Sequence, residues 1–140
     1  MNEELKKRCD IFASNREIIK KKFKWDSDLM CLIYAGSDVT KDLDEIERCE
    51  RLLRENTKTL SIWRGNVKVP TVCRMVNAED PLAYFEKVQR IYGKLNAGKK
   101  LDSDYKAITS LIISDRVSEE TEDSVVARTY EIWDVKLMEH

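Results

Sequence analysis

The sequence predicts an all-α fold of about seven helices, arranged as antiparallel helix pairs in an α-solenoid-like or layered array. Helix breakers are scarce, with four Gly and two Pro in 140 residues, whereas Lys, Glu, Arg and Leu favour helix. Apolar residues recur every three or four positions, and Ser or Asp stands where several of these segments begin. We expect one helical domain spanning residues 1–140, a length that can bury a single core.

The first three expected helices each have a distinct apolar pattern. The first, residues 3–23, carries an apolar stripe interrupted by Arg16. The second, residues 26–34, is apolar on almost every side and should therefore be buried. The third, residues 40–55, begins at Thr40 and has polar residues such as Glu50 away from its stripe. The stripes of the first and third helices are Leu5, Cys9, Phe12, Ile19 and Phe23, and Leu43, Ile46, Cys49 and Leu53.

Turn and capping residues divide the rest of the chain into four more helices. An irregular connection spans residues 56–66, and a fourth helix covers residues 67–77 with Pro70 in its first turn. Asp80-Pro81 opens a fifth helix that ends at Gly98, and Asp102-Ser103 caps a sixth. Ser118 caps the seventh. The stripe of this last helix is Val126, Tyr130, Trp133 and Leu137.

A weak internal repeat supports the pairing of helices. Asp26-Ser27-Asp28 recurs as Asp102-Ser103-Asp104, and Ser37-Asp38-Val39-Thr40 recurs, with one insertion, as Ser114-Asp115-Arg116-Val117-Ser118. Each copy combines a capped apolar helix, an acidic turn and a capped amphipathic helix. A unit of this size cannot bury its apolar face alone, so neighbouring units are expected to stack.

Charge, cysteine content and hydropathy exclude several classes of protein. The 25 basic and 26 acidic residues leave a net charge of −1, which provides no field to attract nucleic acid or an anionic membrane. The start of the chain lacks the layout of a signal peptide, and no apolar run reaches about 18 residues. We therefore expect a cytoplasmic protein with neither nucleic acid nor membrane as partner. The widely spaced Cys9, Cys31, Cys49 and Cys73 are expected to be reduced and buried.

The sequence predicts no catalytic, cofactor-binding or metal-binding residue. Asp26 with Asp28 and Asp102 with Asp104 could be metal ligands or an acid–base pair, but each pair begins a helix, where capping is the simpler interpretation. The only histidine is His140, so no Ser or Cys has a neighbouring imidazole to activate it. The four glycines form no phosphate-binding loop.

Two tryptophan positions are candidate partner contacts. In Trp63-Arg64-Gly65-Asn66 an aromatic ring beside an arginine in a turn could form a binding hot spot. The alternative is that Trp63 enters the core while Arg64 binds carbonyl groups at a helix end, and we favour it because an irregular connection needs an anchor. Trp133 on the last helix is the second candidate, although its place on an apolar stripe is typical of a core residue.

Several segments resemble one uncharacterised bacterial family that is labelled only as a domain of unknown function. They are Phe23-Lys24-Trp25-Asp26, Leu52-Leu53-Arg54-Glu55-Asn56-Thr57, Arg64-Gly65-Asn66, and the spacing from Tyr92 through Asp104-Tyr105 to Ala107-Ile108. These are helix caps and core positions, so the resemblance implies no chemistry. Members of that family are about twice this length, which implies that this chain is similar to an N-terminal half, with His140 either native or the remnant of a tag.

The expected function is a non-catalytic helical-repeat interaction module that binds a protein partner or its own C-terminal half. The alternative is a fragment of an enzyme or small-ligand-binding protein whose site forms only with a missing C-terminal half. No cofactor is expected. Ile132, Trp133 and Val135 on the last helix predict an exposed apolar strip and hence weak self-association at high concentration.

Overall fold

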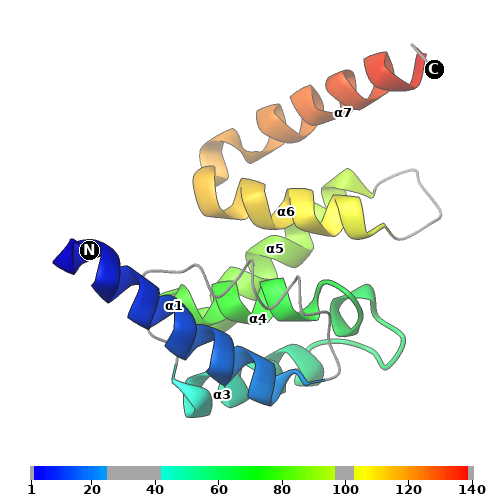
Figure 1. Cartoon of the computed structure of the whole chain (residues 1–140). Helices are drawn as coiled ribbons and strands as arrows, with labels where there is room; N and C mark the ends of the chain where they lie inside the picture. Colours follow the sequence, from blue (N-terminus) through cyan, green and yellow to red (C-terminus); the bar gives the residue numbers. More distant parts are fainter. Residues whose placement is uncertain (1, 25–41, 97–102, 139–140) are drawn as a thin grey trace. The chain divides into compact units, whose positions relative to one another are not determined.

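The computed structural model of the chain describes residues 2–24, 42–96 and 103–138, with side chains described as far as residue 133 (Figure 1). Within these ranges every regular element is helical, which confirms the all-α class, and six are α-helices. They are α1 (Glu3–Lys22), α3 (Leu43–Glu55), α4 (Lys68–Asn77), α5 (Pro81–Leu95), α6 (Asp104–Arg116) and α7 (Glu122–Met138), with the short 3₁₀ helices η1 (Ile62–Arg64) and η2 (Glu119–Thr121). The predicted helix over residues 26–34 and both repeated motifs near it lie outside the described residues.

Helix starts differ from the prediction where a different side chain caps the helix. Helix α3 begins at Leu43 rather than at Thr40, because the carboxylate of Asp42 accepts a hydrogen bond from the amide of Asp44 at 2.8 Å. Ser103 occupies the predicted cap position of α6 but makes no side-chain hydrogen bond to that helix. Ser118 precedes η2, so α7 begins four residues later, at Glu122.

The chain divides into two compact units, Met1–Leu82 and Ala83–His140, and the boundary falls within α5. In the first unit α3 packs against α1, α4 and η1. The predicted α3 stripe is confirmed at Ile46, Cys49 and Leu53, which are fully buried. Other buried apolar residues of this unit include Ile19, Phe23, Trp63, Val67, Val69, Val72, Cys73 and Met75. The single domain of residues 1–140 and its helix-pair repeats stay predictions.

One carboxylate of the first unit is buried beside that core. Glu50 was expected among the polar residues away from the apolar stripe, yet its side chain is only 9% exposed. It forms ion pairs with Lys22 of α1 at 3.2 Å and with Arg54, one turn further along α3, at 3.1 Å. A buried carboxylate is tolerated where cations compensate its charge, so this group couples α3 to the end of α1.

The expectation that all the cysteines are buried is wrong for Cys9. Cys49 and Cys73 are buried, but Cys9 is exposed, and Cys31 lies outside the described residues. The reason is that α1 is buried only in its C-terminal part, at Asn15, Ile19 and the adjoining Phe23. The apolar pattern of α1 therefore extends along the helix beyond the part that packs against the rest of this unit.

Helix α5 is the central element of the second unit. The core cluster contains Ile91, Leu95, Ile113 and Val126, and Val117, Val125, Tyr130 and Trp133 pack against it. A polar row on α5 holds the α6–α7 connection. The hydroxyl of Tyr84 donates to Asp115 at 2.7 Å, and the ammonium of Lys87 donates to the carbonyls of Ser114 and Val117 at 3.0 and 2.7 Å. Lys87 thus binds one carbonyl group in the last turn of α6 and one just beyond its end.

The same row continues into a buried ion cluster at the start of α7. The side chain of Glu122 is 1% exposed and accepts hydrogen bonds from Arg90 at 2.6 and 3.2 Å and from Lys94 at 3.1 Å. Lys94 also pairs with exposed Asp123 at 2.7 Å. The hydrogen bond from Arg90, followed by that from Lys94, lowers the pKa of Glu122 from 4.5 to about 2. The ionised carboxylate therefore fastens the N-terminus of α7 to α5.

Glu122→Gln should destabilise the folded chain in a pH-dependent way. Because the folded-state pKa of Glu122 lies below its unfolded value, its contribution is present above about pH 4.5 and disappears as the pH falls toward 2. At neutral pH we expect a loss of about 2 kcal/mol in the free energy of unfolding, since Arg90 is partly exposed and its attraction is screened. Denaturant titrations at several pH values measure this loss, with Glu120→Gln at an exposed position as control. Equal free energies of unfolding for the two variants at every pH would contradict the prediction.

The thiols should react in the order of their exposure. Burial raises the pKa of Cys49 to about 11, so both its thiolate population and its access to reagent are low, whereas Cys9 is open to solvent. We expect iodoacetamide to modify Cys9 about a hundredfold faster than Cys49 in the folded protein. Peptide mass spectrometry measures both rates in one sample. Similar rates before unfolding would show that the thiol of Cys9 is covered.

Candidate interaction surfaces

The Trp63–Asn66 segment lies in the connection between α3 and α4. Trp63 belongs to η1 and is 4% exposed, and its amide donates to the hydroxyl of Ser61, which caps this short helix, at 3.3 Å. Asn66 is exposed. The indole is therefore part of the first unit's core, and only the polar end of the segment faces solvent.

Arg64 binds the C-terminal end of α3. Its Nη2 donates to the carbonyls of Arg54 and Thr57 at 2.5 and 2.7 Å, and its Nε donates to the Thr57 hydroxyl at 2.9 Å. Thr57 in turn donates to the carbonyl of Leu53 at 2.7 Å, and the side chain of Asn56 donates to Leu52 at 2.8 Å. Three of the last four carbonyls of α3 thus receive side-chain hydrogen bonds. This is the arrangement that the structural alternative for Arg64 predicts.

Trp133, the other candidate contact, lies in the second unit. It is half-buried and packs against the core cluster of that unit. Its ring meets that of Tyr130 edge to face, with centroids 6.0 Å apart and an interplanar angle of 82°. The Tyr130 hydroxyl donates to the carbonyls of Lys94 and Leu95 near the end of α5. Trp133 is thus supported by the core on one side, while the neighbouring Ile132 is exposed.

A row of apolar side chains on the N-terminal part of α1 is exposed. Leu5 and Phe12 are 53% and 37% exposed, and Cys9 between them is also exposed. Spacings of four and three residues place all three on one side of the helix. The sequence predicts a buried Cys9 here because periodicity shows that a helix face is apolar but not what covers it.

A second apolar row lies on α6 in the second unit. Tyr105 is 85% exposed and Ile112, seven residues later, is also exposed, with half-buried Ile108 between them. The opposite side of this helix carries buried Ala107 and Leu111. The structure shows that the core takes one side and leaves the other in solvent.

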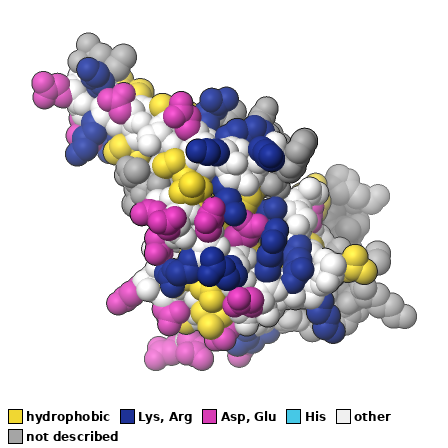
Figure 2. All heavy atoms as spheres, turned by 90° about the horizontal axis from the view of Figure 1, so that it is seen from below, with side chains coloured by type: hydrophobic (Ala, Val, Ile, Leu, Met, Phe, Trp, Pro, Cys, Tyr) yellow, Lys and Arg dark blue, Asp and Glu magenta, His cyan; other side chains and the backbone are white. Residues whose placement is uncertain are grey.

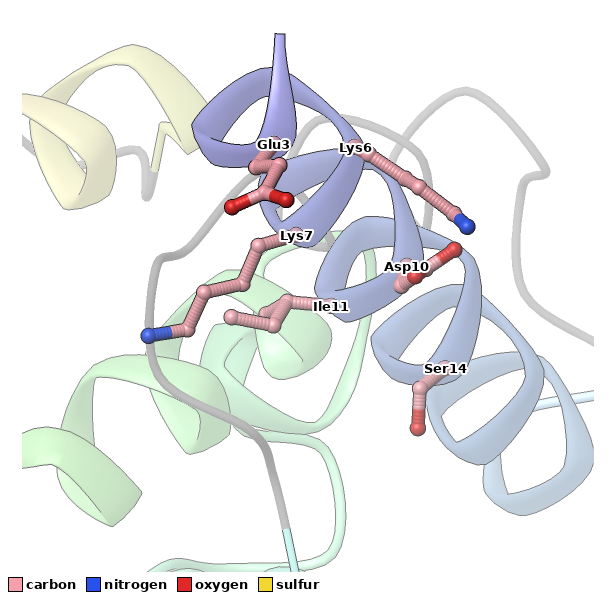
Figure 3. Close-up of a pocket in the computed structure, with 6 residues that line it drawn as sticks. All are labelled: Glu3, Lys6, Lys7, Asp10, Ile11 and Ser14. Atoms are coloured by element: carbon pink, nitrogen blue, oxygen red, sulfur yellow. The ribbon is translucent and has the colours of Figure 1, made fainter.

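Charged side chains of both signs are exposed on the described helices. Figure 2 shows acidic and basic groups interspersed over one face, with smaller hydrophobic areas between them. A shallow hollow of about 540 Å³ lies on α1, and Figure 3 shows the side chains that line it. Its lining mixes both charges: Glu3, Lys6, Lys7, Asp10, Ile11 and Ser14. This mixture favours neither an anion nor a cation.

Only one of the four aspartates considered as metal ligands or acid–base groups lies in the described ranges. Asp104 is exposed at the first position of α6, as expected for a residue at a helix start, whereas Asp26, Asp28 and Asp102 lie outside those ranges. Among the described residues no group of three His, Cys, Asp or Glu side chains could hold a metal ion. None of the helices described there has the length and apolar character that a membrane span requires.

Arg64→Ala should lower stability, since it leaves carbonyl groups at the end of α3 without their donor. We expect a loss of about 2 kcal/mol in the free energy of unfolding, and a smaller loss for Arg64→Lys, which keeps one donor group but not the planar fork. Arg51→Ala, at an exposed position of α3, serves as control. If Arg64→Ala unfolds like the wild type, Arg64 is better explained as a partner contact.

Comparison with known proteins identifies the chain by family alone. No curated protein and no solved structure matched it. The sequence pattern of one family, described as a protein of unknown function, matches residues 15–140. That range includes the Arg64 cap, both buried carboxylates and the whole second unit. The chain therefore belongs to the DUF4003 family of proteins of unknown function.

Proposed function

We propose that this protein is a non-catalytic helical module that binds another protein. The observation that carries the proposal is the pair of exposed apolar rows, one in each unit. Leu5 and Phe12 on α1, and Tyr105 and Ile112 on α6, are each seven residues apart on one helix side. Single exposed hydrophobic residues are ordinary, but rows at helical spacing are typical of surfaces that pack against another helix.

The roles of the buried charged groups support the same proposal. Glu122 is bonded to Arg90 and Lys94, and Glu50 is paired with Lys22 and Arg54. A catalytic acid or base needs a pKa near the working pH and access to substrate. The pKa of Glu122 is lowered to about 2 instead, and its oxygens are occupied by cations from α5. These carboxylates have the character of structural anchors.

The proposal extends to the architecture and the setting of the protein. Antiparallel helix pairs that stack as repeats would provide a continuous surface for a partner, and the alternation of capped helices along the sequence supports such pairs. We also propose a cytoplasmic setting in a bacterium. The free thiols of Cys9, Cys49 and Cys73 are in keeping with a reducing compartment.

Site-specific photocrosslinking in native cells tests the proposal. A photoreactive phenylalanine analogue replaces Phe12 or Tyr105, and the control places it at Arg128, an exposed position of α7. We expect at least one of the two rows to capture one protein in stoichiometric yield, because an apolar contact surface excludes water and holds the probe against its partner. The same faint set of products from all three positions would contradict the proposal.

A further inference from the structure

We propose that the exposed row on α1 is a docking seam for a partner helix whose own apolar seam is bordered by acidic side chains. This inference rests on the proposed function and names the class of partner. Its starting point is a spacing that continues along the whole of α1. The alternating steps of four and three residues join Leu5, Cys9, Phe12, Arg16, Ile19 and Phe23.

This alternation is the spacing of a coiled-coil seam, in which each apolar position meets a neighbouring helix. The C-terminal part of the seam is already covered, since Ile19 and Phe23 are buried in the first unit. The N-terminal part, Leu5 to Phe12, is exposed. The seam is therefore closed at one end by its own unit and open at the other, with the exposed Arg16 between the two parts.

The open part of α1 is an ordered helical surface. The side chain of Asn2 caps the helix by accepting a hydrogen bond from the amide of Glu4 at 2.8 Å. The cap satisfies a backbone donor in the first turn and fixes where the helix begins. A partner that packs here meets a preformed helix and needs to order little of it, which favours association.

The charges that border the open seam are both basic. In a heptad pattern the flanking positions next to Leu5 and Cys9 are Lys6 and Arg8, and charges at such positions select the partner. The acidic residues of this part of α1 occupy other positions. Arg8 forms an exposed ion pair with Glu4 at 3.4 Å, a weak contact that a carboxylate on a partner helix can replace.

Charge also favours an acidic partner helix over two other possible occupants of the seam, a second copy of the chain and an anionic membrane. A second copy of the chain brings the same bordering cations, so pairing between copies gains no opposite-charge contact across the seam. Residues 3–16 contain four basic side chains (Lys6, Lys7, Arg8, Arg16) and three acidic ones (Glu3, Glu4, Asp10). That near balance gives little attraction to an anionic membrane. A helix with bordering Asp or Glu side chains satisfies both the apolar row and the cations.

Two designed peptides test the proposal with the full chain. Each has three heptads with leucine at the seam; one carries Glu at all flanking positions and the other carries Lys. Like charges on the flanks oppose self-pairing of either peptide. Fluorescence anisotropy at low salt measures binding, and we expect the acidic peptide to bind about tenfold more tightly than the basic one.

Exposed residues of α1 supply variants that should leave the fold intact. Leu5→Ser with Phe12→Ser should abolish binding of the acidic peptide, because the seam loses its apolar contacts. Lys6→Glu with Arg8→Glu should invert the preference toward the basic peptide. Lys7→Glu, a charge change on the other side of the helix, is the matched control and should keep the wild-type preference. Circular dichroism and thermal unfolding verify that all variants fold alike.

Three outcomes would overturn the proposal. The first is that the acidic peptide fails to bind at about 100 μM, because a dissociation constant above that concentration is weaker than ordinary helix recognition. The others are equal binding of both peptides and an unchanged preference in the Lys6→Glu, Arg8→Glu variant. Sedimentation showing self-association that the Leu5→Ser, Phe12→Ser variant abolishes would identify a second copy as the occupant. Binding of phosphatidylserine vesicles that requires the same residues would identify a membrane instead.

The seam and the interaction function can fail separately. If the partner captured by photocrosslinking still binds the Leu5→Ser, Phe12→Ser variant, the protein is an interaction module but α1 is not its docking seam. If neither peptide binds and no partner is captured at Phe12 or Tyr105, both proposals are wrong.

Discussion

Both units depend on the same interaction, in which a cationic side chain from another element binds carbonyl groups at the C-terminal end of a helix. The last turn of an α-helix leaves carbonyl groups without a backbone donor. In the first unit Arg64 reaches back from η1 to carbonyls at the end of α3, and in the second Lys87 reaches from α5 to carbonyls at the end of α6. A long cation from another element thus closes each helix and sets the direction of the chain beyond it.

Buried carboxylates complement these cations and specify which helices meet. Glu50 links α3 to Lys22 of α1, and Glu122 links α7 to Arg90 and Lys94 of α5. A buried charge without partners costs several kcal/mol, so packings that separate these groups are disfavoured even where their apolar contacts are equally good. Hydrophobic burial stabilises each unit, whereas the ion clusters select one arrangement of its helices.

Local pattern and long-range contact explain which features could be predicted from the sequence. Periodicity predicted the buried row Ile46, Cys49 and Leu53, because all of its members lie on one helix. The anchoring role considered for Arg64 follows from its place in an irregular connection. Glu122 and its partner Arg90 are 32 residues apart, and nothing in the local pattern marks that pair. The prediction that Cys9 is buried was wrong for a related reason, because an apolar stripe does not show how far along the helix other elements pack against it.

The family match contains the structural anchors of the fold and the exposed row on α6, whereas the open part of the α1 seam precedes it. The caps of α3 and α6 and both buried carboxylates lie within the matched residues 15–140, whereas Leu5, Cys9 and Phe12 precede them. Leu5, Cys9 and Phe12 take part in neither the helix-end hydrogen bonds nor the buried ion pairs described above. Leu5, Cys9 and Phe12 are instead exposed on one side of α1, and their spacing is the one that recognition by another helix requires.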